Sequence, residues 1–375
     1  MHPGGFGEII MFDNVYAGKK VLVTGNTGFK GSWLTTWLLK LGAEVIGISD
    51  RIPTNPSMFE VLHLQGKIKF FQIDIRNLSR ICEIVESENP DYIFHLAAQA
   101  IVSVSYENPI ETISTNVLGT AAILEALRCF KKECIAVIIT SDKCYDNVEW
   151  CWGYRELDSL GGKDPYGASK SAAEMVIKAY YHSFFKNNGN IRVVSVRAGN
   201  VIGGGDWASN RIVPDCIKAW TLGQKVDIRN PLATRPWQHV LEPLSGYLRV
   251  GQMLKNRDSF SGQAYNFGPT SDQTYTVLEL LKQIGSSFCS SNIQDKFEIK
   301  QNSAYHEAGL LKLNCDKALY DLAWLPTLDF KHTAQFTAEW YNNFYQNQID
   351  MFDFTMNQIE RYGQIATEIG REWTN

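Results

Sequence analysis

Residues 19–50, KKVLVTGNTGFKGSWLTTWLLKLGAEVIGISD, hold the order of elements that decides the fold. The apolar run at 19–24 predicts a buried strand, and residues 44–49 predict a second one. Between the two, Gly42 closes a helix that is predicted by apolar residues at helical spacing, namely Trp33, Leu34, Trp37, Leu38 and Leu41. A strand, a glycine loop, a helix and a strand form the context in which a glycine motif indicates a dinucleotide site.

The glycine loop at 25–31 has the spacing G-x-x-G-x-x-G. Glycines permit positive φ and let the backbone approach a pyrophosphate, while the helix N-terminus supplies free N–H groups and a positive dipole end. A tight turn without a ligand is the alternative, and the flanking elements favour the dinucleotide. The cofactor contacts expected here are Gly25, Thr27, Gly28, Phe29 and Lys30.

Three acidic or basic residues follow the next two strands. Asp50 ends the second strand, where a carboxylate accepts hydrogen bonds from a ribose and favours NAD. Arg51 follows directly and would suit the 2′-phosphate of NADP, so we expect NAD while NADP stays open. Asp74 is expected to reach the adenine amino group, to cap the helix at 78–88, or both.

Strands and helices alternate through the first 200 residues. Further strands are predicted at 68–73, 92–96, 134–140 and 191–197, and long helices at 108–127 and 168–185. This order predicts a doubly wound parallel α/β sheet of the Rossmann type. A mixed texture after Val201, with a short strand at 264–267, predicts a second, smaller mixed α/β lobe.

The expected domain organisation follows from this change of texture. Residues 17–200 and roughly 238–270 form the dinucleotide-binding domain, and residues 201–237 and roughly 271–348 form the lobe. Residues 1–16 are expected to be a loose extension, and residues 349–375 a helical tail.

The stretch 136–170 offers several ionisable groups around one pocket. Asp142 and Lys143 follow a β-branched apolar run, so they are placed at the carboxyl end of a parallel strand, where α/β sheets bind ligands. Tyr166 and Lys170 are four residues apart and share a face of a helix. A lysine ammonium near a phenol lowers the pKa of the phenol and makes it usable for proton transfer. A solvated ion pair is the alternative for Asp142 and Lys143.

Composition excludes several classes of protein. The 375 residues carry 36 Lys and Arg against 40 Asp and Glu, so no basic excess suits nucleic acid or membranes. The eight cysteines form no C-x-x-C pair, which favours reduced thiols over zinc or disulfides. No apolar run has the length of a membrane span, and no secretory signal is recognised. His95, inside an apolar run, is interpreted as a core histidine. We expect a cytoplasmic enzyme without a metal.

Several motifs now stand in register. They are Gly25-x-x-Gly28-x-x-Gly31, Asp50, Asp74-Ile75, His95-Leu96-Ala97-Ala98-Gln99, Asn116, Tyr166-x-x-x-Lys170 and Arg197-Ala198-Gly199-Asn200. Each motif is weak, but the ordered set resembles the nucleotide-sugar branch of the extended short-chain dehydrogenase/reductase family, over residues 18–345. The resemblance implies further cofactor contacts from Ile75, Leu96, Ala97, Ala98, Thr115, Thr140 and Ala198.

Within this branch, epimerases carry small residues where this chain has Asp142 and Lys143, and 4,6-dehydratases carry Asp followed by Glu. The Ser141-Asp142-Lys143 triplet, Tyr145, the loop at 205–207 and the segment RPWQHV at 235–240 are similar to the dehydratases of CDP-linked glucose. The resemblance therefore implies an NAD-dependent hydro-lyase that forms CDP-4-dehydro-6-deoxyglucose. Such enzymes supply 3,6-dideoxyhexoses of bacterial O-antigen.

The resemblance also implies roles for single residues. Tyr166 takes the proton of the sugar 4-hydroxyl, Lys170 holds the nicotinamide ribose, and Ser141 hydrogen-bonds the 4-oxygen. Asp142 is the acid for the leaving 6-hydroxyl, and Lys143 is either the base at C5 or an orienting residue. The expected substrate contacts are Gln99, Asn200, Arg211, Arg235 and Tyr305.

Two other functions stay open. The first is a dehydratase or epimerase of a dTDP- or UDP-linked sugar, because no residue in the sequence reveals which nucleobase of the substrate is recognised. The second is a non-catalytic dinucleotide-sensing protein, although such proteins commonly lose the Tyr or the Lys. The helices at 107–129 and 168–185 are where this family pairs, so a homodimer or homotetramer is expected.

Overall fold

The computed structural model describes residues 9–187, 189–228, 230–288, 296–299, 310–347 and 349–374. Seven strands form one parallel sheet in the order β11-β6-β5-β4-β1-β2-β3. They are β1 (Lys20–Thr24), β2 (Glu44–Ser49), β3 (Lys69–Gln72), β4 (Tyr92–His95), β5 (Cys134–Ile139), β6 (Ile191–Ala198) and β11 (Ala264–Phe267). The six expected strands are all present, and the short strand at 264–267 joins them as a seventh, at the edge beside β6.

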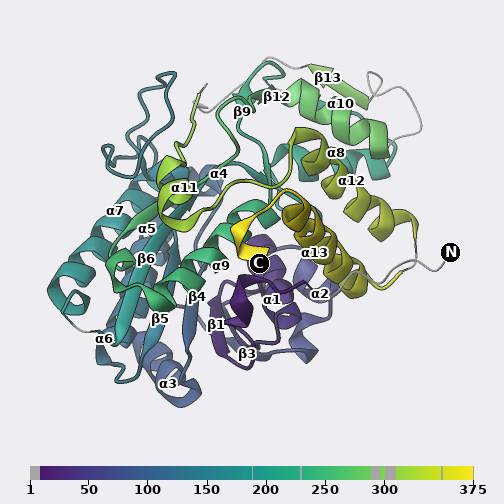
Figure 1. Cartoon of the computed structure of the whole chain (residues 1–375). Helices are drawn as coiled ribbons and strands as arrows, with labels where there is room; N and C mark the ends of the chain where they lie inside the picture. Colours follow the sequence, from purple (N-terminus) through teal and green to yellow (C-terminus); the bar gives the residue numbers. More distant parts are fainter. Residues whose placement is uncertain are drawn as a thin grey trace.

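Helices cover both faces of the sheet, because successive residues of a strand point to opposite faces. In β1, Val21 and Val23 belong to one buried cluster and Leu22 to the other. One face packs against α1 (Phe29–Lys40) and α9 (Leu241–Asn256), and the other against α3 (Leu78–Glu88), α6 (Gly119–Cys129) and α7 (Pro165–Tyr180). This three-layer arrangement is visible in Figure 1.

The expected smaller lobe lies at the top of Figure 1. Its strands form three short pairs: β7 (Val201–Ile202) with β10 (Gln238–His239), β8 (Val226–Ile228) with β13 (Phe297–Ile299), and β9 (Thr234–Arg235) with β12 (Tyr275–Thr276). Its helices are α8 (Ile212–Thr221), α10 (Val277–Phe288) and α12 (Phe330–Gln346). Further α-helices among the described residues are α2 (Met58–Val61), α4 (Val102–Glu107), α5 (Pro109–Ile113), α11 (Asp316–Leu322) and α13 (Met351–Glu368).

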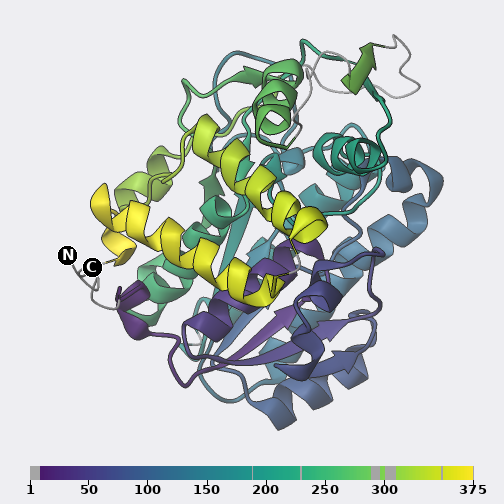
Figure 2. The same ribbon diagram turned by 90° about the vertical axis from the view of Figure 1, so that its right-hand side faces the viewer.

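The first and last described segments of the chain pack together on the outside of α1. Residues 11–16 are not the loose extension that was expected, because Phe12 is fully buried and stacks on Trp373 with ring centroids 5.1 Å apart. The tail is helical as predicted, and Figure 2 shows α12 and α13, in yellow-green and yellow, side by side on this outer surface. The hydroxyl of Tyr362 on α13 donates to the buried carboxyl of Glu242 at 3.0 Å. The tail is thereby tied to the start of α9.

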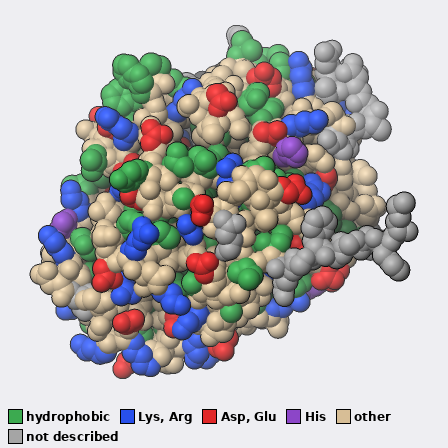
Figure 3. Space-filling view, viewed as in Figure 1, with side chains coloured by type: hydrophobic (Ala, Val, Ile, Leu, Met, Phe, Trp, Pro, Cys, Tyr) green, Lys and Arg blue, Asp and Glu red, His purple; other side chains and the backbone are tan. Residues whose placement is uncertain are grey.

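The surface shows no segregation of charge on the face drawn in Figure 3, where basic and acidic side chains are interspersed. None of the helices in the described part of the chain is both long and apolar enough to cross a bilayer. Within the same residues, no group of three or more His, Cys, Asp or Glu is placed to hold a metal ion. The cysteines that the structure describes are all free thiols.

Candidate active site

The glycine loop is shaped by close backbone contacts. Gly25 has a φ of 73°, and a Cβ there would lie 2.7 Å from the backbone nitrogen of Ala97. A Cβ on Gly31 would lie 2.0 Å from the carbonyl oxygen of Gly25, so only glycine fits at both ends of the loop. Gly28 is the N-cap of α1, and no side chain caps this helix. The first-turn N–H groups are therefore left for an anion, which fits the pyrophosphate of a dinucleotide.

The residues expected around the adenosine ribose lie at the end of β2. Asp50 and Arg51 are exposed, and the Arg51 Nε is 3.5 Å from a carboxylate oxygen of Asp50. The hydroxyl of Thr27 donates to the carbonyl oxygen of Arg51 at 2.7 Å. This hydrogen bond holds the glycine loop against the end of β2, where the adenosine ribose is expected to bind.

Asp74 is bound by a neighbour. Its carboxylate accepts from the Arg76 Nε at 3.0 Å, and this hydrogen bond lowers the pKa of Asp74. The expectation that Asp74 caps α3 is wrong, because the N-cap is Asn77, whose side chain accepts from the backbone N–H of Arg80. Ile75 is buried against Gly119, where a Cβ would lie 2.3 Å from its Cδ1. Asp74 remains near the sheet edge as an ion-paired, partly exposed group.

The residues after β4 lie against the glycine loop. The backbone nitrogens of Leu96 and Ala97 both donate to Thr24, at 3.1 Å each, and Ala98 is half-buried. Ala198 is buried at the end of β6. Thr115 is half-buried, and its hydroxyl donates to Glu111 at 3.4 Å.

His95 is a buried core histidine, as interpreted from the sequence. Its Nδ1 is 2.7 Å from the Thr24 hydroxyl, and its Nε2 is 3.2 Å from the Thr120 hydroxyl. Burial lowers the pKa of His95 to about 3, so the ring is neutral and satisfied. It plays no visible part in the site.

The acid of the site follows β5 directly. Ser141 is the N-cap of the short 3₁₀ turn η4 (Asp142–Cys144), and its hydroxyl accepts from the backbone N–H of Lys143 at 3.2 Å. The same hydroxyl donates to Asp142 Oδ1 at 3.0 Å. Asp142 is only 5% exposed, and burial raises its pKa against the opposing charge of Lys143. The carboxyl is thereby suited to hold a proton above the ordinary range of an aspartate.

Tyr166 and Lys170 lie one turn apart on α7, whose N-cap Asp164 accepts from Gly167 at 3.0 Å. Burial raises the pKa of Tyr166 to about 12, and a hydrogen bond with Ser141 acts in the lowering direction. Burial also lowers the pKa of Lys170 to about 8. The expectation that Lys170 lowers the pKa of Tyr166 stays a prediction, because desolvation of the phenol is the largest influence on its pKa.

Two further lysines lie near the acid. Lys143 is half-buried, and its charge acts on Asp142. Lys30, from the first turn of α1, interacts electrostatically with Asp142, Lys170 and Arg211. Burial and the charge of Arg211 lower the pKa of Lys30 to about 8. The side chain of Lys30 thus faces the catalytic groups as well as the cofactor loop.

A buried ion pair behind the site was not predicted from the sequence. The Glu174 carboxylate accepts from Arg197 Nε at 2.9 Å and from Arg197 Nη2 at 2.8 Å. The Tyr145 hydroxyl accepts from Arg197 Nη1 at 2.7 Å. Thr140, which is predicted to contact the cofactor, donates its hydroxyl proton to Glu174. The signal that was missed is the position of Glu174, four residues after Lys170 on the buried face of α7.

The predicted substrate contacts differ in how they are placed. Arg211 pairs with Asp206 at 2.8 Å and acts electrostatically on Tyr166, so it lies beside the catalytic groups. Arg235 Nη1 donates to the carbonyl oxygen of Thr234 at 2.9 Å. Asn200 is half-buried at the end of β6, and its carbonyl oxygen accepts from Gln238. Tyr305 lies outside the described residues.

The side chain of Gln99 makes hydrogen bonds to nearby residues. Its amide nitrogen donates to the carbonyl oxygen of Ile101 and to Thr112, and its amide oxygen accepts from the N–H of Ile101. Asn116, in the π-helical turn η3 (Ser114–Leu118), bonds both backbone groups of Gln99 and the Ser169 hydroxyl. Asn116 therefore has a structural role, and the contact of Gln99 with a substrate stays a prediction.

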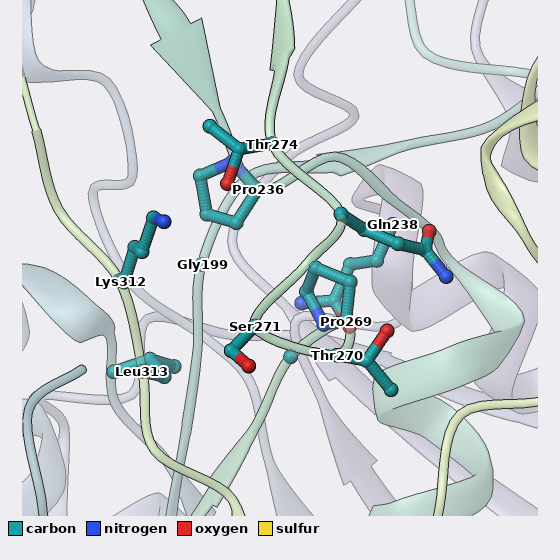
Figure 4. A pocket seen from close by; sticks show the side chains of 11 residues that line it. Gly199, Pro236, Gln238, Pro269, Thr270, Ser271, Thr274, Lys312 and Leu313 are labelled. Atoms are coloured by element: carbon teal, nitrogen blue, oxygen red, sulfur yellow. The ribbon is translucent and has the colours of Figure 1, made fainter. Parts of the chain in front are cut away.

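A pocket adjoins these groups at Gly199, where a Cβ would lie 3.1 Å from Asp142 Oδ2. Figure 4 shows its lining from four segments: Gly199 after β6, Pro236 and Gln238 at the start of β10, the loop after β11, and Lys312 with Leu313 opposite. The loop contributes Gly268, Pro269, Thr270, Ser271, Gln273 and Thr274. A pocket therefore lies between the catalytic strands and the smaller lobe.

The family model described as GDP-mannose 4,6 dehydratase matches residues 22–337. The chain belongs to this family. Over 358 residues it is 41% identical to the CDP-glucose 4,6-dehydratase of Salmonella typhimurium, a match that covers 94% of this chain and 99% of that protein. It is 26% identical to the CDP-paratose 2-epimerase of Salmonella typhi, over 86% of this chain and 98% of that one. The predicted family and its hydro-lyase class are confirmed by these matches.

The fold of this family member recurs in solved structures. The dTDP-glucose 4,6-dehydratase DesIV of Streptomyces venezuelae, with NAD and TYD bound, superposes with a TM-score of 0.74 at 22% identity, covering 86% of this chain and 97% of that one. The epimerase Mth375 of Methanothermobacter thermautotrophicus also gives 0.74, at 24% identity over 94% and 97% of the two chains. The predicted Rossmann architecture is confirmed.

Proposed function

We propose that this member of the family converts CDP-glucose to CDP-4-dehydro-6-deoxyglucose, with NAD as its resident cofactor. The observation that carries the proposal is the buried acid Asp142 beside Ser141 and Tyr166. Inverting C4 of a sugar needs no acid at C6, whereas loss of the 6-hydroxyl does. The choice of the CDP sugar is supported by the 41% identity to the Salmonella dehydratase along nearly the whole chain.

The side chains divide the proton transfers among them. NAD, held by the glycine loop at 25–31, would supply a hydride acceptor for C4 and a hydride donor for C6. Tyr166 accepts the proton of the sugar 4-hydroxyl, and Ser141 holds the 4-oxygen. Lys143 takes the proton from C5, which the new ketone acidifies, and Asp142 protonates the leaving 6-hydroxyl. The Glu174–Arg197 pair holds α7 against β6 and so positions Tyr166 and Lys170.

Cofactor binding in this proposal rests on the uncapped N-terminus of α1 and the close-packed glycine loop. Asp50 accepts from the adenosine ribose, which favours NAD over NADP. Lys30 and Arg211 bring positive charge to the side of the site where phosphates of cofactor or substrate would lie. The division into a dinucleotide-binding domain and a nucleotide-sugar lobe is part of the same proposal.

The proposed assembly is a homodimer or homotetramer through the helices at 107–129 and 168–185. Large apolar side chains are exposed there: Ile110, Leu118, Met175 and Phe184 have 77%, 59%, 66% and 46% of their surface accessible. Such a patch on two neighbouring helices suits a second copy. Sizing in solution should give an oligomer, and a charged residue at Met175 should shift it toward monomers. The proposed location is the cytoplasm, with the product used for 3,6-dideoxyhexoses of O-antigen.

The test of the activity is incubation with CDP-, UDP- and dTDP-glucose, followed by the alkali-induced absorbance of a 4-ketosugar. The proposal predicts ketosugar from CDP-glucose. Turnover of dTDP-glucose alone would assign the chain to another dehydratase, and an epimer without ketosugar would make it an epimerase. Absence of any turnover, with the cofactor bound, would favour a dinucleotide-sensing protein. Tyr166→Phe should abolish turnover and retain cofactor binding.

A further inference from the structure

The glycine loop is attached to the end of β2 by side chains that the dinucleotide motif does not include. Ser49, the last residue of β2, is 4% exposed, and Asn26, the second residue of the loop, is fully buried. The Ser49 hydroxyl donates to Asn26 Oδ1 at 3.0 Å and accepts from the backbone N–H of Thr27 at 3.3 Å. One hydroxyl therefore uses its proton and a lone pair on two consecutive residues of the loop.

The strand leaves room for this contact. Gly47 lies two residues before Ser49, so the two positions face the same side of the sheet. A Cβ at Gly47 would lie 2.5 Å from Asn26 Nδ2, so a larger residue there would displace the amide group. β2 thus places a glycine beside the amide nitrogen of Asn26 and a serine beside its amide oxygen.

Asn26 is a poor choice of residue for stability alone. Its Nδ2 is buried and has no hydrogen-bond partner within the part of the chain that the structure describes. Burying an unpaired amide donor disfavours folding. The backbone carbonyl oxygen of Asn26 accepts from the Ser32 hydroxyl at 3.0 Å, at the start of α1. Asn26 therefore connects β2 to the helix whose N-terminus suits a pyrophosphate.

We propose that Ser49 and Asn26 are positioning residues for NAD, which hold the glycine loop in its binding shape before the cofactor arrives; the proposal rests on the proposed function. Asp50, which is proposed to bind the adenosine ribose, follows Ser49 directly. Ser49 therefore sets the spacing between the loop that binds the pyrophosphate and the carboxylate that binds the ribose. Neither Ser49 nor Asn26 acts on the reacting atoms.

A preformed loop raises the affinity for the cofactor without changing the chemistry. When only a fraction of the molecules holds the loop in its binding shape, the apparent affinity falls by that fraction. Removing both hydrogen bonds of Ser49 should lower the affinity about tenfold. Because bound NAD restores the shape of the loop, turnover at saturating NAD should stay close to that of the unchanged chain.

The experiment removes NAD from the full-length chain and titrates it back, with calorimetry for binding and ketosugar formation for KM and kcat. Ser49→Ala is expected to weaken binding and raise the KM for NAD about tenfold, with kcat changed by less than about twofold. Hydrogen exchange of the Thr27 amide in the NAD-free chain should become faster. Asn26→Ala removes the same contact from the loop side and should give a smaller loss of affinity, and the double variant should match Ser49→Ala.

Thr36→Val is the matched control. Its fully buried hydroxyl donates to the carbonyl oxygen of Ser32, one turn earlier on α1, and its loss should leave NAD affinity and Thr27 exchange unchanged. Unchanged affinity in Ser49→Ala, a loss of kcat at saturating NAD in place of affinity, or an equal loss of affinity in Thr36→Val would overturn the positioning role.

Two further outcomes are also decided. If Ser49→Ala does not fold, Asn26→Ala decides by the same titration and the same amide exchange. Absence of ketosugar from the unchanged chain would overturn the proposed function, whereas the calorimetric titration of NAD would still test the loop.

Discussion

Asp142 and Glu174 lie on two sides of the catalytic groups and are equally buried, each with 5% of its surface exposed. The pKa of Asp142 is raised and that of Glu174 is lowered. The difference lies in their partners: Glu174 accepts two hydrogen bonds from Arg197, whereas Asp142 accepts one from the neutral Ser141. Burial therefore does not fix the role of an acid. A carboxylate that is ion-paired with an arginine stabilises the structure around the site. A carboxyl group without such an arginine can bind and release a proton.

The largest expected effect comes from replacing Asp142, whose carboxyl group is proposed to donate a proton to the leaving 6-hydroxyl. Asp142→Asn should lower dehydration about 10²–10⁴-fold, the range for loss of a general acid, while the free energy of unfolding changes little. Oxidation at C4 should persist, since it does not need Asp142. The measurement is ketosugar formation beside absorbance of the reduced cofactor. Normal dehydration would remove Asp142 as the acid.

Glu174→Ala tests the other member of the pair. It should lower the free energy of unfolding by about 3–5 kcal/mol, because Arg197 is left buried without its carboxylate. Glu125→Ala is the matched control: its pair with Arg128 lies on the surface of α6, so the free energy of unfolding should change far less. Denaturant unfolding gives both values. Similar losses in the two variants would show that the Glu174–Arg197 pair is no stronger than a surface pair.

Lys143→Met asks whether the acid works with a neighbouring base. We expect C4 oxidation to continue while exchange of the C5 hydrogen with solvent deuterium falls about 10²-fold. Nuclear magnetic resonance of the sugar in deuterated buffer measures this exchange. Unchanged exchange would assign Lys143 to orienting Asp142, and Lys30 would then be the next residue to replace.

The pH dependence of the two acids should have opposite signs. Because the pKa of Asp142 is raised, its contribution to stability is present below its unfolded pKa and is lost as pH rises through the folded value. Because the pKa of Glu174 is lowered, its contribution is present above its unfolded pKa and is lost as pH falls through the folded value. Difference infrared spectra against Asp142→Asn should show a protonated carboxyl above the ordinary Asp pKa of about 3.9. A fully ionised Asp142 at that pH would contradict the comparison.

The smallest effect is expected at an exposed carboxylate that is also paired. Asp74 accepts from Arg76 at the sheet edge, with 39% of its side chain accessible. Asp74→Asn should change the free energy of unfolding by less than about 1 kcal/mol and leave the rate of dehydration unchanged. A weaker affinity for NAD, measured by titration, would support the adenine contact. A large loss of turnover would place Asp74 in the chemistry.

Much of this arrangement could be predicted because it depends on local pattern. The spacing of apolar residues along the sequence predicts the alternation of strands and helices. Gly25 and Gly31 determine the shape of their loop, because close backbone contacts leave no room for a Cβ at either position. The spacing of Tyr166 and Lys170 places both on one face of α7, as expected. Ser141 and Asp142 follow β5 at the edge where ligands bind.

The features that could not be predicted are contacts between residues that lie far apart in the sequence. The hydrogen bond from Thr140 to Glu174 was not predicted, and Arg197, the buried partner of Glu174, lies on another strand. The pKa of Tyr166 depends on how deeply the phenol is buried, which spacing to Lys170 does not reveal. The docking of residues 11–16 depends on Trp373 at the opposite end of the chain. Each of these is a long-range packing event without a local pattern.

The most direct test of the central claim follows one labelled hydrogen. CDP-glucose deuterated at C4 is converted by the NAD-loaded chain, and the product is examined by mass spectrometry and nuclear magnetic resonance. If one site oxidises C4, removes water with Asp142 and reduces C6, the deuterium appears in the 6-methyl group of a 4-ketosugar. Deuterium that remains at C4 of an epimerised sugar, or that is lost to solvent, would contradict the account.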